Sequence, residues 1–336
     1  MQYYDNVQPY SYEEMEKYEN RIYSQLFFNN ANQNIIIDID NITNRTPNLF
    51  IDHDYNLPQN IFLLKGFRNQ IIVGRKLKSI LRIENKINAI NCSMLTAPML
   101  LGILNNRCKT GRRIEISYFP FSSDEKQTVF NEIKKNRMTD IYYPYNYIEY
   151  ETNKEEVSPD TGWSFNPNRK QYLGYGEVHL RKFTNKYFKS YDSNNKIIYD
   201  PACSTGEFLA EFKKYHPNSH TIGHDLSQEM INYAKEYVDE SWCCNALDSP
   251  LADESVDLMF LRFLNSQVVS TEDATKMFLI LLTKVKKGGL IAVFGNTAVL
   301  LTEEWLLQNG VKILNCSGYD RWRDAIFQYY VMEKNS

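Results

Sequence analysis

The chain has 336 residues, of which 43% are hydrophobic and 24% are charged, values typical of a globular protein. Its 38 basic and 41 acidic residues give a formal net charge of -3, which argues against nucleic-acid binding through bulk neutralisation of phosphates. No apolar run reaches the roughly 20 residues of a membrane span, no signal-peptide pattern is present, and the six cysteines form no Cys-x-x-Cys pair. We therefore expect a cytoplasmic protein without a membrane segment or a structural metal.

The first half of the chain predicts a small α+β domain. Its expected elements are a helix at 11–28 opened by the capping box Ser11-Tyr-Glu-Glu14, strands at 34–40 and 70–90, a helix at 95–106, a strand at 114–121 and a helix at 123–136. The polar stretch 151–172 contains Pro159 and Gly162 and predicts a linker or long loop. We therefore expect an N-terminal domain over 1–160 and a second domain over 161–336.

Strands and helices alternate through the second half of the chain. The expected elements are a helix at 175–190, strand 196–200, helix 205–215, strand 220–224, helix 227–238, strand 241–244, strand 256–261, helix 271–285, strand 290–294, helix 302–308, and strands 311–316 and 325–333. Five strands that alternate with helices favour a parallel sheet, and two final strands without a helix between them favour an antiparallel hairpin. The predicted fold class is α/β, with a doubly wound, mostly parallel sheet of seven strands.

Three predicted strand ends carry residues suited to a nucleotide-like ligand. The first strand ends at Asp200 and is followed by the small residues 201–206, the second ends at Asp225, and the third is followed by Asn245 and Ala246. In a doubly wound sheet, the loops at the carboxyl ends of the strands line one crevice. An acidic residue suits ribose hydroxyls, small residues let the backbone approach a ligand, and an Asn beside an Ala suits an adenine edge.

These residues resemble the class I S-adenosylmethionine-dependent methyltransferases over about residues 172–333. Of the family's first motif, Asp/Glu-x-Gly-x-Gly-x-Gly, the segment Asp200-Pro-Ala-Cys-Ser-Thr-Gly206 keeps the acid and the last glycine, while Ala202 and Ser204 replace the other two. Asp225-Leu-Ser-Gln-Glu-Met230 resembles the ribose-binding segment, Asn245 stands where Asp is commonest, and Lys286-Lys-Gly-Gly-Leu290 resembles the turn before strand five. The resemblance implies a Rossmann-like fold, S-adenosylmethionine as cofactor and S-adenosylhomocysteine as product.

The resemblance also implies a set of site residues. Expected cofactor contacts are Tyr175, Asp200, Ala202, Cys203, Ser204, Gly206, Asp225, Leu226, Met230, Asn245, Ala246 and Arg262. Cys203 is expected to contribute its backbone rather than its thiol. For Asp200 the alternative is a helix cap, and for Asn245 it is plain turn chemistry.

The expected catalytic residues are His179 and Tyr175, which are four residues apart and so share a helix face. The unperturbed pKa of histidine lies near neutrality, so His179 is a candidate general base. The alternative is that this helix start only packs. His216, His220 and His224 flank one strand, which spreads side chains apart, so we expect no metal there.

Two related classes of enzyme lack their signatures in this chain. A nicotinamide dehydrogenase would carry Gly-x-Gly-x-x-Gly at the first helix, where only Gly206 is present. A DNA amino-methyltransferase would carry Asn/Asp-Pro-Pro-aromatic after the fourth strand, where this chain has Leu261-Arg-Phe-Leu-Asn-Ser266. We therefore expect no DNA substrate.

The expected function is methyl transfer to a small-molecule acceptor at O, N or C, in specialised metabolism. The N-terminal domain is expected to shape the acceptor pocket or to form a homodimer. Two alternatives remain open at this point. The first is a protein or RNA methyltransferase that docks through the N-terminal domain, and the second is a protein that binds the cofactor without methylating.

Overall fold

A computed structural model describes residues 37–52, 61–76, 94–111, 113–145, 154–155, 157–159, 162 and 177–335. The described residues fall into two units. The first lies within Met1–Asn146 and includes Tyr319–Phe327, and the second lies within Tyr147–Gly318 and includes Gln328–Ser336. None of the described helices is long and apolar enough to cross a membrane.

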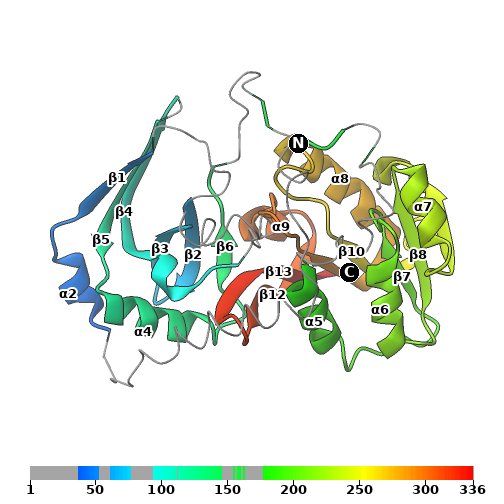
Figure 1. Ribbon diagram of the computed structural model, residues 1–336, viewed down its shortest axis with the longest axis horizontal. Coiled ribbons are helices and arrows are strands. Elements are labelled where there is room, and N and C mark those ends of the chain that lie inside the picture. Colours follow the sequence, from blue (N-terminus) through cyan, green and yellow to red (C-terminus); the bar gives the residue numbers. More distant parts are fainter. Residues whose placement is uncertain are drawn as a thin grey trace, which may run out of the picture. The chain divides into compact units, whose positions relative to one another are not determined.

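The first unit is built on a sheet with the strand order β1-β5-β4-β3-β2-β6. Its strands are β1 (Asn48–Asp52), β2 (Ile61–Phe67), β3 (Gln70–Arg75), β4 (Leu100–Thr110), β5 (Arg113–Pro120) and β6 (Asp140–Tyr142), and neighbouring strands run antiparallel. The described helical segments are α2 (Ile39–Thr43), the short 3-10 helix η1 (Ala97–Met99) and α4 (Ser123–Ile133). Figure 1 shows α4 across the lower ends of the sheet strands.

Two predictions in this unit are wrong where the structure describes them. The segment predicted as strand 34–40 enters α2, because the Asp38 side chain accepts a hydrogen bond from the Asn41 N–H at 3.1 Å and caps a helical turn. The segment predicted as helix 95–106 is mostly β4, which pairs with both β3 and β5. Gly102 allows this pairing, since a Cβ there would overlap the Phe119 carbonyl.

The other predictions in the first half have mixed outcomes. The predicted strand 114–121 corresponds to β5 and the predicted helix 123–136 to α4, whose capping box joins Ser122 and Glu125. Of the predicted strand 70–90, residues 70–75 form β3 and most of the remainder lies outside the described residues. The predicted helix 11–28 also lies outside them.

The second unit contains most of a sheet with the order β12-β13-β11-β10-β7-β8-β9; the end of β12 and the start of β13 belong to Tyr319–Phe327 of the first unit. Its elements are α5 (Val178–Tyr187), β7 (Ile197–Asp200), α6 (Glu207–Tyr215), β8 (His220–Asp225), α7 (Gln228–Ala234), β9 (Glu240–Cys243), the 3-10 helix η4 (Ala246–Asp248), β10 (Val256–Leu261), α8 (Thr271–Lys284), β11 (Val285–Val293), α9 (Glu303–Gln308), β12 (Val311–Asp320) and β13 (Ala325–Lys334). Strands β11, β10, β7, β8 and β9 pair in parallel, and β13 runs antiparallel to β11. This is an α/β, Rossmann-like arrangement.

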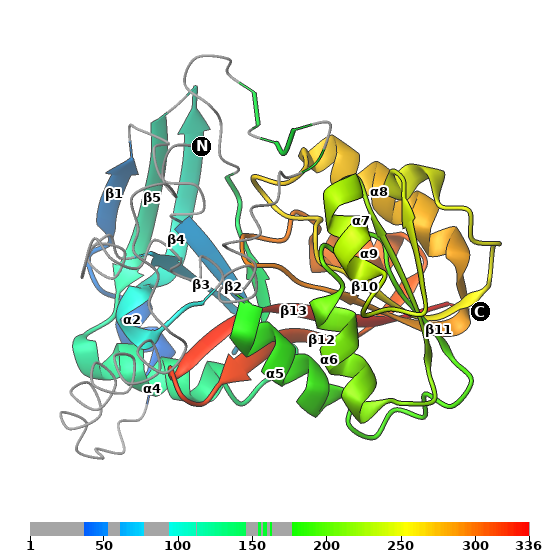
Figure 2. The same cartoon turned by 45° about the vertical axis from the view of Figure 1, so that its right-hand side comes forward.

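Helices cover both sides of this sheet. Figure 2 shows α6 and α7 (green) on one side and α8 (orange) on the other. Every residue of β10 is buried, as expected for a central parallel strand. The predicted helix 271–285 ends at Lys284 rather than at the Lys-Lys-Gly-Gly turn, because residues 285–289 already belong to β11.

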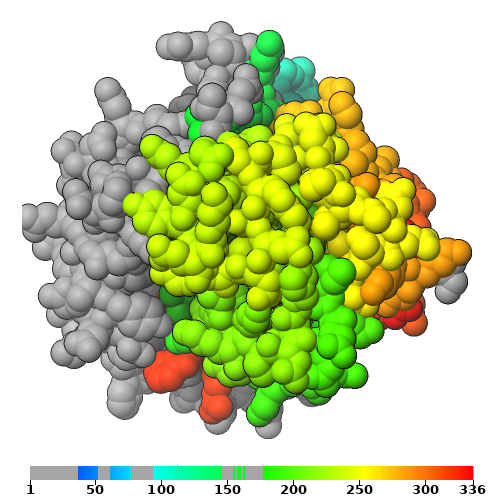
Figure 3. Space-filling model, turned by 90° about the vertical axis from the view of Figure 1, so that its right-hand side faces the viewer, coloured from blue at the N-terminus to red at the C-terminus, as the bar shows by residue number. Residues whose placement is uncertain are grey.

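A buried aromatic cluster holds α6 on the sheet. Phe260 of β10 lies edge-to-face against Phe208 and Phe212 of α6, with ring centroids 5.0 and 5.1 Å apart, and Phe294 extends the cluster at 6.3 Å. Such contacts are directional, so they fix the first turn of α6 and with it the loop that precedes it. The surface of this unit is seen in Figure 3, where the segments around α6, α7 and β9 form one continuous face in green to yellow.

Candidate functional site

The loop between β7 and α6 is shaped by close backbone contacts. The Asp200 carboxylate accepts a hydrogen bond from the Ala202 N–H at 3.1 Å, and the Cys203 N–H donates to the His224 carbonyl at 2.6 Å. Ser204 and Gly206 adopt φ of 53° and 78°, the left-handed region that reverses a chain in few residues. The predicted loop residues therefore stand together at the carboxyl end of β7.

Cys203 has a structural role in this loop. Its side chain is buried against β8, where a Cβ at Gly223 would lie 2.6 Å from its sulfur. Burial raises the pKa of the Cys203 thiol, with the carboxylates of Asp200 and Asp225 adding to the effect. A neutral buried thiol is a poor nucleophile. That Cys203 contributes its backbone to the cofactor site stays a prediction.

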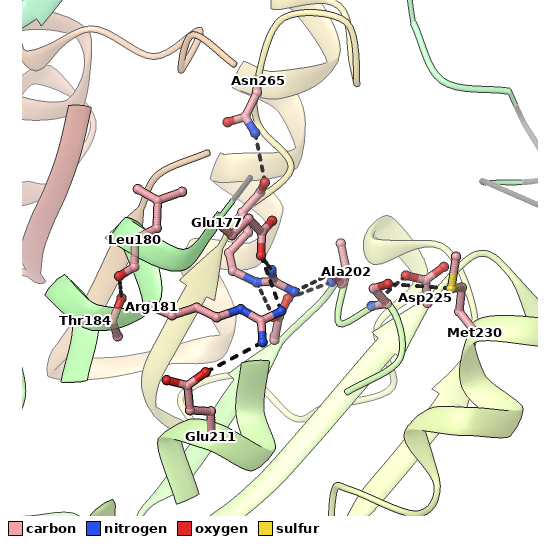
Figure 4. Close-up of polar contacts among 12 residues, drawn as sticks. Glu177, Leu180, Arg181, Thr184, Ala202, Glu211, Asp225, Met230 and Asn265 are labelled. Atoms are coloured by element: carbon pink, nitrogen blue, oxygen red, sulfur yellow. Dashed lines mark hydrogen bonds and ion pairs between the residues drawn. The ribbon is translucent and has the colours of Figure 1, made fainter. Parts of the chain in front are cut away.

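Asp225 connects the end of β8 to the same loop. One carboxylate oxygen accepts from the Ser204 N–H at 2.9 Å and the other accepts from the Ser227 N–H at 2.9 Å. The Ser204 hydroxyl lies 3.5 Å from the Met230 sulfur, so Asp225, Ser204 and Met230 form one contact group, seen at the right of Figure 4. Each carboxylate oxygen has a second lone pair, so ribose hydroxyls could still donate to Asp225.

The third strand end combines turn chemistry with a side-chain amide. The Asn245 side-chain oxygen accepts from the Leu247 N–H at 2.9 Å and begins η4, while Ala246 is buried. The Cys244 N–H donates to the Asp225 carbonyl at 3.1 Å, which fixes this loop beside the end of β8. The Asn245 amide nitrogen remains a donor for an adenine edge. Leu226, between these two strand ends, is 42% exposed and presents an apolar surface.

Arg262 lies at the centre of a buried charged cluster that we call the Arg262 cluster. Its Nε donates to Asp200 at 2.7 Å, its Nη1 to Glu177 at 2.8 Å, and its Nη2 approaches the Ala202 carbonyl at 3.4 Å. The guanidinium also lies 4.5 Å from the centre of the Phe208 ring. Three of its five N–H groups thus face protein partners. Arg262 therefore has few donors left for the predicted contact with the cofactor.

Burial and ion pairing have opposite effects on the pKa values of the charged groups in this cluster. Burial raises the pKa of the Asp200 carboxyl, and the Arg262 guanidinium opposes that rise. Burial lowers the pKa of Arg262, but Asp200 and Glu177 raise it further, so the guanidinium stays charged. Arg181 extends the cluster more loosely, at 3.8 Å from Glu177 and 3.6 Å from Glu211 (Figure 4).

Glu177 is a site residue that the sequence indicates only as one of the polar residues in the segment before the first predicted strand. It precedes α5 directly and contacts Arg262, 85 positions further along the chain. That segment predicts no partner for Glu177, because an acidic residue at a helix start is also common on surfaces. A contact between residues so far apart cannot be inferred from either segment alone.

Of the two predicted catalytic residues, the structure describes only His179. His179 is buried in the first turn of α5, with 3% of its surface exposed. Tyr175 lies outside the described residues, and α5 begins at Val178 rather than at 175. The role of this pair stays a prediction. Across the described ranges, no group of His, Cys, Asp and Glu side chains is arranged to hold a metal ion.

The buried histidine of β8 predicts a pH dependence of stability. His224 is fully buried and its Nδ1 lies 2.8 Å from the Tyr199 hydroxyl, and burial lowers its pKa to about 4. In the unfolded chain this histidine binds a proton near pH 6.5. The contribution of the neutral ring to the free energy of unfolding is therefore fully present above pH 6.5 and is lost as the pH falls toward about 4. Between pH 7 and pH 4.5 we expect a loss of roughly 2 kcal/mol from this group. Urea unfolding at pH 7 and pH 4.5 would measure it.

The matched variant is His224→Gln, which removes the titrating ring and leaves the carboxylates unchanged. Its unfolding free energy should fall less between these two pH values than that of the unaltered protein. An equal fall in both proteins would contradict the assignment to His224.

Comparison with known proteins identifies a methyltransferase domain in the second half of the chain. The family model described as "Methyltransferase domain" matches residues 198–289, which include β7, β8 and their loops. The chain is 29% identical over 245 residues to isonocardicin synthase of Nocardia uniformis subsp. tsuyamanensis, covering 73% of this chain and 80% of that protein.

Solved structures of the same class show a weaker likeness. A SAM-dependent methyltransferase from Aquifex aeolicus has 19% identity and a TM-score of 0.38, covering 51% of this chain and 100% of that one. One from Leishmania major has 12% identity and a TM-score of 0.39, covering 49% and 77%. TM-scores this low do not identify a family. The identification as a methyltransferase rests instead on the matched domain and on the residues at the strand ends. The chain therefore carries a class I S-adenosylmethionine-dependent methyltransferase domain and is an enzyme that uses S-adenosylmethionine as its cofactor.

Proposed function

We propose that this chain transfers a methyl group from S-adenosylmethionine to a small-molecule acceptor at O, N or C, in specialised metabolism. The observation that carries the proposal is the relative at 29% identity, which is named for the compound that it synthesises. The segment 261–266 supports it, because it lacks the Asn/Asp-Pro-Pro-aromatic tetrapeptide that holds an extruded base.

The residues of the site fit this cofactor. Asp225 is held by two backbone N–H groups in a position to accept from ribose hydroxyls, and Asn245 stands one strand further along. The small loop residues 202–206 let backbone groups come close to the ligand. Bound there, the cofactor supplies a methyl group on a sulfonium whose leaving group is neutral. The protein's part is then to position the acceptor and to exclude water.

A general base is required only for some acceptors. A phenol, a carboxylate or an acidic carbon reacts with little help, whereas a neutral alcohol must lose its proton as the new bond forms. For such an acceptor we propose His179 as the base. Tyr175, which lies outside the described residues, stays the second proposed catalytic residue. The N-terminal residues 1–160 would then shape the acceptor pocket or form a homodimer.

One observation favours a second candidate function. The relative is named a synthase rather than a methyltransferase, so the same fold could bind the cofactor without transferring its methyl group. A protein or RNA acceptor is the remaining alternative. The three candidates differ in where the methyl group goes, which makes them separable in one assay.

The test uses S-adenosylmethionine labelled in its methyl group. The protein is incubated with this compound and with separated small-molecule, protein and RNA fractions of a cell extract, and calorimetry measures binding of S-adenosylhomocysteine. We expect binding in the micromolar range and label in a small molecule whose mass has grown by one methylene. Label in protein or RNA, a different mass increment, or tight binding without any labelled product would each refute the proposal.

A further inference from the structure

One face of the sheet in the first unit carries cationic side chains beside an apolar cluster. The members of that cluster are Ile61, Leu63, Val73, Ile114 and Ile116. Strand pairing places Arg75 directly beside Ile61 and Arg107 directly beside Ile116. Lys65 follows Leu63 by two residues, and side chains alternate between the two faces along a strand, so Lys65 lies on the same face.

Contacts across this face show that the sheet curves around it. The Arg75 guanidinium on β3 lies 4.2 Å from the centre of the Phe50 ring on β1, although β4 and β5 stand between these two strands. The Arg107 guanidinium on β4 lies 5.8 Å from the centre of the Tyr142 ring on β6, with β3 and β2 between them. Neighbouring strands are about 4.8 Å apart, so side chains three strands apart meet this closely where the sheet curves with this face inward. Figure 1 shows β1, β5 and β4 on one side of this unit and β3, β2 and β6 on the other.

Two of the cations meet at a single aromatic ring. The Lys65 ammonium lies 5.5 Å from the centre of the Tyr142 ring, which the Arg107 guanidinium also approaches. The separation of the two cations therefore cannot exceed the sum of these two short distances. Arg107 is exposed, and Lys65 keeps 36% of its side-chain surface exposed, so both can contact a ligand. We call Lys65, Arg75, Arg107, Phe50 and Tyr142 the cationic face.

Carboxylates neutralise only part of the charge of this face. Asp140 is the one carboxylate among the side chains that the structure describes there, and it lies 3.8 Å from the Lys65 ammonium. Neither Arg75 nor Arg107 forms an ion pair with another described residue. In the Arg75 guanidinium only Nε is buried without a partner, so its Nη groups can still donate. The whole chain has a formal net charge of -3, so the positive charge is concentrated locally here.

We propose that the cationic face binds a small organic anion, a molecule with a carboxylate or a phosphate on an aromatic or apolar body. Arg107 and Lys65 donate to the anionic oxygens, and Arg75 adds a second guanidinium whose paired N–H groups match either kind of anion. The half-buried rings of Phe50 and Tyr142 offer apolar surface to the body of the ligand. This site belongs to the first unit and goes beyond the proposed function.

The form of the cationic face favours a small molecule over a nucleic acid. A phosphate backbone is followed by an extended row of cations with successive stacking platforms. Here the cations lie on an inward-curved sheet, and two of them contact the same ring, that of Tyr142. Such an arrangement suits a single anionic group.

The test titrates benzoate, phenyl phosphate and the neutral benzyl alcohol into the full chain and follows each probe by ligand-observed NMR. Each titration is run with and without excess S-adenosylhomocysteine, which reveals any probe that enters the cofactor site. The variants are Arg107→Gln and Arg75→Gln. The matched control is Arg113→Gln, which makes the same change of charge. Arg113 precedes Ile114 on β5 and so lies on the opposite face, where it pairs with Glu115 at 2.6 Å.

We expect both anionic probes to bind in the millimolar range, as befits ligands of so few atoms, and benzyl alcohol not to bind. A tighter benzoate identifies a carboxylate ligand, and a tighter phenyl phosphate identifies a phosphate ligand. Arg107→Gln and Arg75→Gln should each weaken binding by roughly tenfold, the effect of losing one charge-assisted hydrogen bond. Arg113→Gln should stay within about twofold of the unaltered protein. Urea unfolding confirms that each variant is folded, and the exposed Arg107 keeps the test decisive if Arg75→Gln is not.

Several results would overturn the inference. The first is absence of binding by both anionic probes, and the second is unchanged binding in Arg107→Gln. An equal loss in Arg113→Gln would trace the effect to overall charge, and displacement by S-adenosylhomocysteine would assign the probes to the cofactor site. Tighter binding of an oligouridylate, weakened by the same variants, would assign the face to nucleic acid. None of these results depends on methyl transfer, so they leave the proposed function untouched.

Discussion

Replacing Arg262 by Met should lower the free energy of unfolding by about 3–5 kcal/mol, the usual cost of leaving a buried charge without its partner. Asp200 is fully buried, and Arg262 is its closest cationic neighbour, at 2.7 Å. Without the guanidinium, Asp200 must be protonated or the loop must move, and Glu177 loses its contact at the start of α5. Affinity for S-adenosylhomocysteine should fall as well, because the moving loop carries Ala202 and Ser204. Urea unfolding and calorimetry would measure both effects.

The chain offers a matched control in Arg181. It belongs to the same group of charges but lies at 3.8 and 3.6 Å from its two carboxylates, beyond hydrogen-bond distance. Arg181→Met should therefore lower the free energy of unfolding by less than Arg262→Met does, because it breaks no hydrogen bond to a carboxylate. Arg262→Lys keeps the charge but loses the planar fork that reaches two carboxylates at once, so its stability should fall between the other two. If Arg262→Met proved as stable as Arg181→Met, the cluster would not have the role assigned to it.

The second half of the fold could be predicted because its signals are local. Each parallel strand is a short run of apolar residues, and two of the helices between strands begin at a serine cap, Ser227 for α7 and Ser270 for α8. The carboxyl ends of parallel strands meet at one edge, so Asp200 and Asp225 could be placed together from the sequence alone. The structure connects both to one loop, through Ala202 and Ser204.

The first half was harder to predict because its strands depend on distant partners. Residues 100–110 contain apolar positions compatible with a helix, yet they pair with β3 and β5 over most of their length. Strands β1, β2 and β6 had no local pattern strong enough to be predicted. Pairing of this kind outweighs the helix propensity of the segment, since it satisfies the backbone N–H and carbonyl groups of β4 on both of its edges.

The same distinction explains which site residues could be predicted. The strand-end residues follow from topology, whereas the Arg262 cluster joins residues 177, 200 and 262.

Replacing Asp225 by Ala should lower the affinity for S-adenosylhomocysteine by roughly 100-fold or more, since hydrogen bonds to a charged group contribute about 1.5–3 kcal/mol each and the ribose would lose two.

The change also leaves the Ser204 and Ser227 N–H groups without their acceptor, so a control must separate ligand contact from loss of stability. Asp239 provides it. Its carboxylate accepts from the Thr221 N–H at 2.7 Å and pairs with Lys213, but it stands at the opposite end of β8. Asp239→Ala should lose stability and keep its affinity. Calorimetry on both variants separates the two effects. Equal losses of affinity would trace the loss to folding, and full affinity in Asp225→Ala would refute the ribose contact.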